Sequence, residues 1–395
     1  MIRRATPLVA AVCAAVMLAG CAGGAETGTS SSPQNSHQPT DCRAEYLGNI
    51  MMGSYPDDSA QMVFARNVWD MQTYRGKVYF GGGDYDANMG PCDIYCYDSQ
   101  TGKIDKSASA LPDEQIARFV TADHTVFLPI TDNIGSGKGG YFKLENGVWQ
   151  CCRYIDGALH CFDMVKYAGR YFAGIGLDYG DNLNSAIKAS VDGIHFDNVD
   201  IYRDGRKARV DSDSFGRCYD LFTYGSGLYA YYRADTGDYF NGLYRYDGES
   251  NRFEFISTMF LPLNCRNSNE NYLTVQSKFE FGGKMFFINN CVICTDDFAA
   301  YTTLALPHGA VARDGWVRFG KMYITAAVQK GDGTYDNYVF AVDSSGGVEE
   351  IICFTAAGYC VSFEYCEDCF LFAIGTSRTQ LKTECGSIYK IAYKL

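Results

Sequence analysis

One phrase recurs along this chain: an apolar strand, a turn that carries Gly or Asp, and a second, aromatic strand. The clearest copies begin at Trp69-Asp70-Met71, at Phe162-Asp163-Met164 and at Tyr219-Asp220-Leu221. The phrase returns about every forty to fifty-five residues, and its patterning is that of strands, with helical periodicity essentially absent. A repeat of this length and type is typical of the blades of a β-propeller.

Aligning the turns of this phrase divides the chain into seven units. Their second strands are expected to begin near Val78, Val126, Tyr171, Leu228, Met285, Met322 and Phe370. We therefore predict an all-β protein, a β-propeller with seven blades favoured. Six or eight blades are the alternatives, because the fifth unit is short and the second is weakly patterned.

The two ends of the repeat complement each other. The last unit ends at Leu395 one strand short, and the strand-like segment 44–52 belongs to no other unit. An open sheet would leave an aromatic edge exposed. We therefore predict that the N-terminal strand closes the last blade.

The first 43 residues are expected to lie outside the propeller domain, which spans 44–395. Arg3 and Arg4 precede an apolar stretch too short to cross a bilayer. Leu18-Ala19-Gly20-Cys21 then resembles the lipobox of bacterial lipoproteins, in which the cysteine is lipidated. The resemblance implies a signal peptide over 1–21, a flexible Ser/Gly-rich tether over 22–43, and an extracytoplasmic protein anchored to the cell membrane by the lipid on Cys21. An ordinary signal peptide ending near Ala22 is the alternative.

The charge of the chain limits its partners. The formal net charge is −12, and removal of Arg3 and Arg4 with the signal peptide makes it −14. Such a surface repels nucleic acid and anionic headgroups. We expect no nucleic-acid partner, membrane contact only through the N-terminal lipid, and a monomer.

The chain has 17 cysteines, an unusual number for this architecture. Without Cys13 and Cys21 an odd number remains, so complete intramolecular pairing is excluded. Cys161 and Cys218 precede the same aromatic-Asp phrase and are interpreted as small buried hydrophobic residues. The pairs Cys291/Cys294 and Cys366/Cys369 have C-x-x-C spacing, but the first lies in a strand, where residues three apart face opposite sides. The second pair flanks a turn and can close a hairpin, and we predict no metal site.

Two short segments suggest a family. Ser190-Val191-Asp192-Gly193-Ile194-His195-Phe196 resembles the Asp-box of sialidase-like propellers, and 294–298 resembles a degenerate second copy. The resemblance implies a structural hairpin in which the Asp caps turn amides and the aromatic residue packs beneath. It also raises a sialidase-like glycoside hydrolase as a possible function, although the Arg that the family places before its Ile-Pro phrase is absent at 126–130.

A first set of candidate site residues lies on the innermost strands and should converge on the propeller axis. The column consists of Asp70, Arg118, Asp163, Asp220, Ser277, Asp314 and Ser362. Carboxylates around a narrow tunnel raise one another's pKa or bind a cation such as Ca²⁺, the one cofactor considered. The alternative is structural, with each Asp bonding backbone amides of the next blade. Asp70, Asp163 and Asp220, with His160 near the mouth, are the candidate catalytic residues.

A second set lies in the loops that join the second and third strands of each blade, beside the blade connections. The predicted ligand-binding residues are Asp84, Tyr85, Asp86, Asp178, Tyr179 and Asp235, with Arg118 and Arg217 near the axis. Acidic groups beside Tyr rings suit sugars, because the rings stack on C–H groups and the carboxylates accept from hydroxyls. Ordinary solvated turns are the alternative, since turns also use Asp, Gly and Asn.

The sequence therefore predicts a cell-surface propeller that binds a glycan or small polar ligand on an acidic, aromatic face. A glycosidase and a protein-interaction scaffold are the alternatives. Paired carboxylates at a suitable separation would perform glycoside hydrolysis.

Overall fold

The computed structural model describes residues 43–135, 137–150, 152–178, 181, 183–209, 215–234, 238–258 and 275–395. These residues belong to one compact unit. The predicted signal peptide, Cys21 and the tether up to residue 42 lie outside them. In the described ranges, no helix is both long and apolar enough to cross a membrane.

The described chain is built almost wholly of antiparallel strands. The first four units contain β2 (Met71–Tyr74), β3 (Lys77–Gly81), β4 (Cys92–Asp98) and β5 (Lys103–Leu111); β6 (Val120–Ala122), β7 (Thr125–Pro129), β8 (Gly140–Glu145), β9 (Val148–Trp149) and β10 (Arg153–Tyr154); β11 (His160–Tyr167), β12 (Arg170–Gly176), β13 (Ile187–Ser190) and β14 (Asp197–Asn198); and β17 (Gly216–Tyr224), β18 (Gly227–Ala234), β19 (Gly242–Asp247) and β20 (Arg252–Ser257). The last three contain β21 (Ser277–Phe281), β22 (Lys284–Asn289), β23 (Cys291–Thr295) and β24 (Thr302–Leu304); β25 (Val311–Arg318), β26 (Lys321–Gln329), β27 (Tyr335–Val342) and β28 (Val348–Ala356); and β29 (Tyr359–Cys366), β30 (Cys369–Gly375), β31 (Ser387–Ala392) and β1 (Glu45–Asn49).

The remaining elements are short. They are the helix α1 (Ala60–Ala65), the 3-10 turns η1 (Ile50–Gly53), η2 (Tyr85–Ala87), η3 (Asp238–Phe240) and η5 (Pro307–Gly309), and the hairpin β15 (Asp200–Arg203) and β16 (Arg206–Lys207). β15 pairs in parallel with β20 and so extends the outer edge of the fourth unit.

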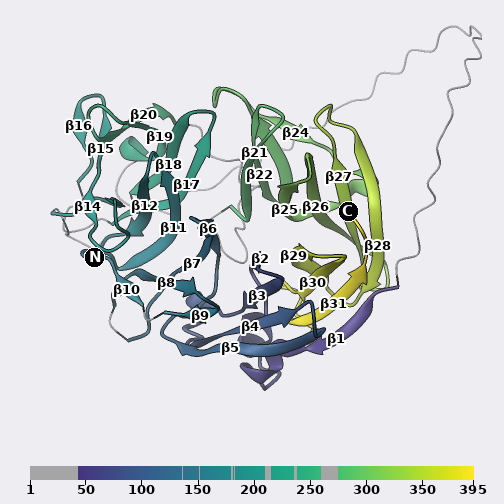
Figure 1. The fold of residues 1–395 in the computed structure, drawn as a ribbon. Helices are drawn as coiled ribbons and strands as arrows, with labels where there is room; N and C mark the ends of the chain where they lie inside the picture. The colour runs from purple at the N-terminus through teal and green to yellow at the C-terminus, as the bar shows by residue number, and fades with distance from the viewer. Residues whose placement is uncertain are drawn as a thin grey trace, which may run out of the picture. The chain divides into compact units, whose positions relative to one another are not determined.

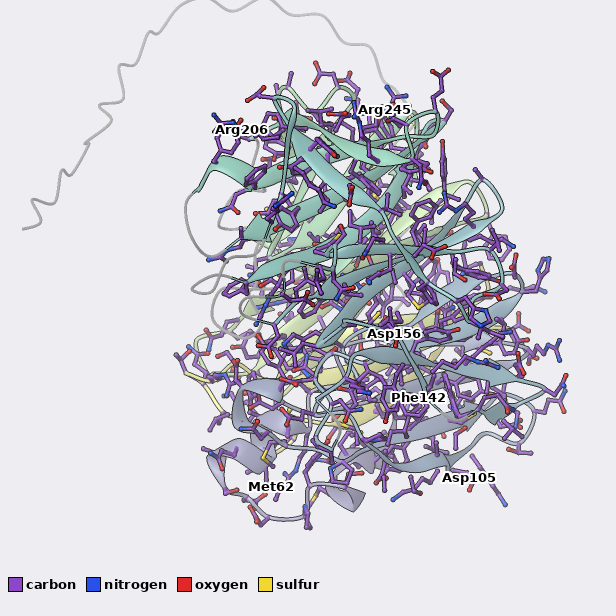
Figure 2. The ribbon with its side chains drawn as sticks, turned by 90° about the vertical axis from the view of Figure 1, so that its left-hand side faces the viewer. Met62, Asp105, Phe142, Asp156, Arg206 and Arg245 are labelled. Carbon is purple, nitrogen blue, oxygen red and sulfur yellow. The ribbon has the colours of Figure 1, made fainter. Side chains whose placement is uncertain are left out.

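The sheets surround a common centre, and the fold is a β-propeller, as predicted (Figure 1). Five sheets of four or five strands are separate blades. The ten-stranded sheet contains two meanders, β11–β14 and β17–β20, joined at the single pair Gly176↔Arg217. Counting these meanders as two blades would give the favoured number of seven, which stays a prediction. Figure 2 shows Arg206 and Arg245, beside and within the fourth unit, far from Met62 of α1 and Asp105 of β5.

The last blade is closed by the N-terminal strand. β1 pairs antiparallel with β31, with Glu45 opposite Lys390 and Asn49 opposite Ser387. In Figure 1 the purple β1 lies beside the yellow β31. The predicted closure is confirmed, and it removes a free sheet edge near the chain ends.

Two sequence features favour regular pairing of the inner strands: apolar second strands and tight turns before them. Second strands such as β30 are apolar throughout, because both faces are buried between neighbouring blades. The turns before them carry two residues with positive φ, such as Arg75-Gly76 (51° and 74°) and Ala168-Gly169 (46° and 78°). Such turns match the twist of a two-residue hairpin, and Gly adopts this conformation without steric cost.

The two segments that resemble an Asp-box have the local hydrogen bonds expected of such a turn. Asp192 Oδ1 accepts from the backbone N–H of Ile194 (2.7 Å) and of His195 (2.9 Å), and Ser190 Oγ accepts from Gly193. Phe196 packs beside the ring of Tyr141. The second copy repeats the pattern: Asp297 Oδ1 accepts from Ala299, and Thr295 Oγ1 accepts from Phe298, whose φ of 58° takes the place of a turn glycine.

Most cysteines in the described ranges are buried free thiols. Cys161 and Cys218 lie in the core, as predicted, and Cys291 is part of a disulfide. Cys291 and Cys294 face different hydrophobic clusters, as expected for strand residues three apart. Cys366 and Cys369 are opposite each other in the β29–β30 hairpin but are both free, so no bond closes that hairpin.

Candidate functional site

The predicted axial column is set up by a repeated irregularity in the innermost strands. A β-bulge falls just before the column residue in four units, between Cys161 and Asp163, Cys218 and Asp220, Ala312 and Asp314, and Cys360 and Ser362. Where a cysteine precedes the bulge, its thiol donates to the column residue's carbonyl, at 3.2–3.9 Å. A bulge re-aims the side chain that follows it.

Several column side chains hold the next blade by its backbone. The Asp70 carboxylate accepts from Phe119 N–H (2.6 Å) and the Asp163 carboxylate from Leu221 N–H (2.8 Å). Asp314 accepts from Phe363 N–H (3.2 Å), and Ser277 Oγ accepts from Gly315 N–H (3.0 Å). This is the geometry of the structural alternative, in which each column residue fixes the ring between blades.

At the same level, four charged side chains bridge the axis. Arg118 lies 3.1 Å from Asp163 and 3.2 Å from Asp220, and Lys278 Nζ lies 2.5 Å and 2.7 Å from the same two carboxylates. Arg118 also donates to the carbonyl of Val275. These groups come from the second, third, fourth and fifth units. We call Arg118, Asp163, Asp220 and Lys278 the axial plug.

A cavity of about 630 Å³ lies beside the axial plug, along the innermost strands. Its wall includes Asp70, Asp314, Arg318 and Glu364, together with polar side chains such as Thr121 and Thr223, which are exposed. Four aromatic residues also line it: Phe119, Phe222, Phe279 and Trp316. The volume is in the range of small-molecule sites, and convergent polar groups on a partly apolar wall are typical of them.

Three carboxyl groups of this wall are harder to ionise than usual. Burial raises the pKa of Asp314 to about 7, against the hydrogen bonds that it accepts. Burial and the nearby Asp314 raise the pKa of Asp70. Burial also raises the pKa of Glu364, although Arg318 lies 2.8 Å away and favours its ionised form. Asp220 differs, because Lys278 and Arg118 overcome the effect of burial and lower its pKa.

The acidic loop at 84–86 pairs with another blade. Arg378, which follows β30, lies 2.5 Å from Asp84 and 3.0 Å from Asp86. Tyr85 packs against a cluster of Phe162, Tyr219 and Tyr231. The loop therefore ties the first blade to the last through its carboxylates and reaches the third and fourth units through its ring.

His160 and Arg217 are held near this aromatic cluster. His160 Nδ1 is 2.8 Å from the carbonyl oxygen of Thr131 and 3.7 Å from Asp132, and the ring stacks on Phe162. Burial lowers the pKa of His160. The Arg217 guanidinium lies 4.3 Å from the ring centre of Phe215. Within the described ranges, the hydrogen bonds and ion pairs of Asp163 do not include His160.

The remaining predicted ligand residues are less informative. Asp178 is exposed. Tyr179 and Asp235 lie outside the described residues, and so do the neighbouring positions 180, 182, 236 and 237. For the part of the chain described, no three His, Cys, Asp or Glu side chains are grouped so that they could hold a metal ion.

Sequence reasoning missed four residues that complete these arrangements: Lys278, Arg318, Glu364 and Arg378. Lys278 and Glu364 lie one and two positions beyond the column residues Ser277 and Ser362, so a wider column would have included them. Arg378 carries no local signal, because its partners are nearly 300 positions away in the chain.

Comparisons with known proteins identify no family for this chain. No protein-family model matches the chain, and no curated protein sequence matches it. Similar solved structures include a protein from Lactobacillus plantarum (11% identity, TM-score 0.44, 76% of this chain and 89% of that chain) and a putative 6-phosphogluconolactonase from Bacteroides fragilis (12%, 0.43, 82% and 97%). A third is Sqt1 of Saccharomyces cerevisiae (10%, 0.40, 84% and 97%). Propellers host many unrelated functions, so likeness at these identities says nothing about what this chain binds.

Proposed function

We propose that this protein binds a small polar ligand, a sugar or related polyol, in the cavity beside the axial plug. The observation that supports it is the make-up of the wall, where Trp316 and Phe279 stand near the carboxylates of Asp70 and Asp314. Aromatic faces pack on the C–H groups of a sugar ring, and carboxylates accept from its hydroxyls. This ligand is of the kind predicted from the sequence, but the proposed binding site is the cavity and not the loop at 84–86.

Binding is favoured over glycoside hydrolysis because two of the candidate catalytic carboxylates, Asp163 and Asp220, are already paired within the axial plug. Both lie within 3.2 Å of Arg118 and of Lys278, and Asp163 also accepts from Leu221 N–H. A glycosidase needs two carboxyl groups free to act on the scissile bond. Turnover of any sugar in the binding screen would favour the enzyme instead.

Filling the mouth of the cavity should weaken ligand binding. Thr121 and Thr223 are exposed on β6 and β17 and line the cavity, so Thr121→Trp and Thr223→Trp add bulk without touching the buried charges. We expect each variant to weaken binding by about tenfold or more, a loss of about 1.4 kcal/mol. Isothermal titration of the full-length chain in detergent, with a panel of mono- and disaccharides, measures this.

The matched control is Thr101→Trp, which adds the same side chain at an exposed position in the turn between β4 and β5. It should bind as the unchanged chain does. Binding that survives both mouth substitutions would place the site elsewhere, and a chain that binds nothing in the panel would favour the scaffold alternative.

We also propose that the domain is held at the cell surface by lipid on Cys21, which rests on the lipobox resemblance of residues 18–21. Cys21→Ala should move the protein from the membrane fraction to the soluble fraction, or leave the signal peptide attached. Fractionation with mass spectrometry of the mature N-terminus measures this. A lipid-free mature chain that begins elsewhere would contradict the proposal.

A further inference from the structure

The positive charges in the cavity wall are already neutralised. Arg118 and Lys278 share Asp163 and Asp220 within the axial plug, at 2.5–3.2 Å. Arg318 pairs with Glu364 and donates to the carbonyl oxygen of Tyr365 at 2.6 Å. An anionic ligand would therefore have to compete with a carboxylate for each of these cations.

Two carboxyl groups of the axial column that line this wall have no such cation partner. Among the described residues, Asp70 and Asp314 make no ion pair within 4 Å, and their hydrogen bonds come from Phe119 N–H and from Ser277, Gly315 and Phe363. Arg118 acts on Asp70 only at longer range. Burial raises the pKa of Asp70, and repulsion between Asp70 and Asp314 raises it further. A positive group between them would relieve this repulsion.

The aromatic wall suits a positive group as well. Trp316 and Phe279 are half-buried and line the cavity on the sides of the sixth and fifth units. The guanidinium of Arg318 already lies 4.9 Å from the centre of the Trp316 ring. Ring faces of this kind attract ammonium groups, most strongly where water is excluded.

We propose that the cavity selects ligands that carry an ammonium group, such as an amino sugar, over neutral or anionic ligands of the same size. The inference rests on the proposed function. The ammonium group lies near Asp70 and Asp314, and the rest of the ligand extends along Trp316 toward the mouth. Neutral sugars bind through stacking and hydroxyl contacts alone, and sugar acids meet the unpaired carboxylates.

Three probes of similar size test this with the full-length chain in detergent: N,N,N-trimethyl-D-glucosaminium, N-acetyl-D-glucosamine and D-glucuronate. Their charges are +1, 0 and −1 at about pH 7, and the first is permanent, so ligand titration does not intervene. We expect the cation to bind about tenfold or more tightly than the neutral sugar, and the acid to bind most weakly. Isothermal titration gives the three dissociation constants.

Asp70→Asn tests whether this carboxyl group causes the preference, because the amide oxygen still accepts from Phe119 N–H but the amide cannot ionise beside a bound cation. We expect the preference for the cation over the neutral sugar, taken as the ratio of their dissociation constants, to fall to about threefold or less. The ratio is the readout because the loss of the carboxylate weakens hydroxyl contacts to both sugars alike. The matched control is Glu280→Gln, which removes one charge from an exposed position of the same wall. Glu280→Gln should keep most of the preference for the cation over the neutral sugar.

The outcomes separate the two proposals. Neutral sugar that binds as tightly as the cation would overturn the ammonium inference and leave the proposed function standing. Cation binding that falls equally in Glu280→Gln and Asp70→Asn would overturn it too, because general charge would then explain the preference. No binding by any probe or by the saccharide panel would overturn both. The order of the three probes in the unchanged chain decides the inference even where a variant does not fold.

Discussion

Removal of residues up to Gly53 is expected to lower the free energy of unfolding by about 3–6 kcal/mol. The deletion takes away β1 and its pairing with β31, together with the contact between Tyr46 and Tyr389 at 5.3 Å. It also removes Met51, which is fully buried between the first and last blades. The exposed edge of β31 would be a template for association between chains.

The comparison is between a chain that begins at Arg43 and one that begins at Ser54, both without the predicted lipid. Urea unfolding gives the stability of each, and light scattering gives their association. We expect the shorter chain to be less stable and to associate at lower concentration. An equal unfolding free energy in the two chains would mean that the ring does not depend on β1 for closure.

The sequence predicted these features because they depend on local patterns. The repeated phrase, the shortage of one strand before Leu395 and the unassigned strand at 44–52 are all visible without knowing the packing. The same holds for the turn at Asp192, whose hydrogen bonds join neighbours in the chain. Local hydrogen bonds and strand periodicity are the parts of a fold that one sequence carries most directly.

The candidate site was harder to predict, because it depends on contacts between blades. Asp70, Asp163 and Asp314 were placed on the axis, yet the sequence did not show which amide or cation each would meet. The acidic loop at 84–86 was predicted to bind a ligand, whereas Arg378 from the last blade lies against Asp84 and Asp86. A partner nearly 300 residues away leaves no trace in spacing.

Lys278→Met is expected to destabilise the protein by about 3–5 kcal/mol, the cost of breaking a buried ion pair by removing one partner. Lys278 is nearly buried and lies within 2.7 Å of both Asp163 and Asp220. Without it, two buried carboxylates share Arg118 alone. The axial plug would lose its contact with the fifth unit through Lys278 and would carry an uncompensated negative charge.

The matched control is Lys166→Met, which breaks the exposed ion pair between Lys166 and Asp123 and should cost at most about 1 kcal/mol.

The pH dependence gives a second test. Burial opposes ionisation of Asp220, but Lys278 and Arg118 hold its pKa below the usual value. The ionised Asp220 therefore stabilises the fold at pH values above its pKa in the unfolded chain. This stabilisation is lost as the pH falls through the lower pKa of the folded protein. In Lys278→Met this support is weaker, and protonation of the carboxylates relieves the unpaired charge. The difference between the two proteins in urea unfolding should therefore narrow from about pH 7 to pH 4. A difference that stays constant over this range, or one no larger than that of Lys166→Met, would show that the charges of the axial plug do not hold the blades together.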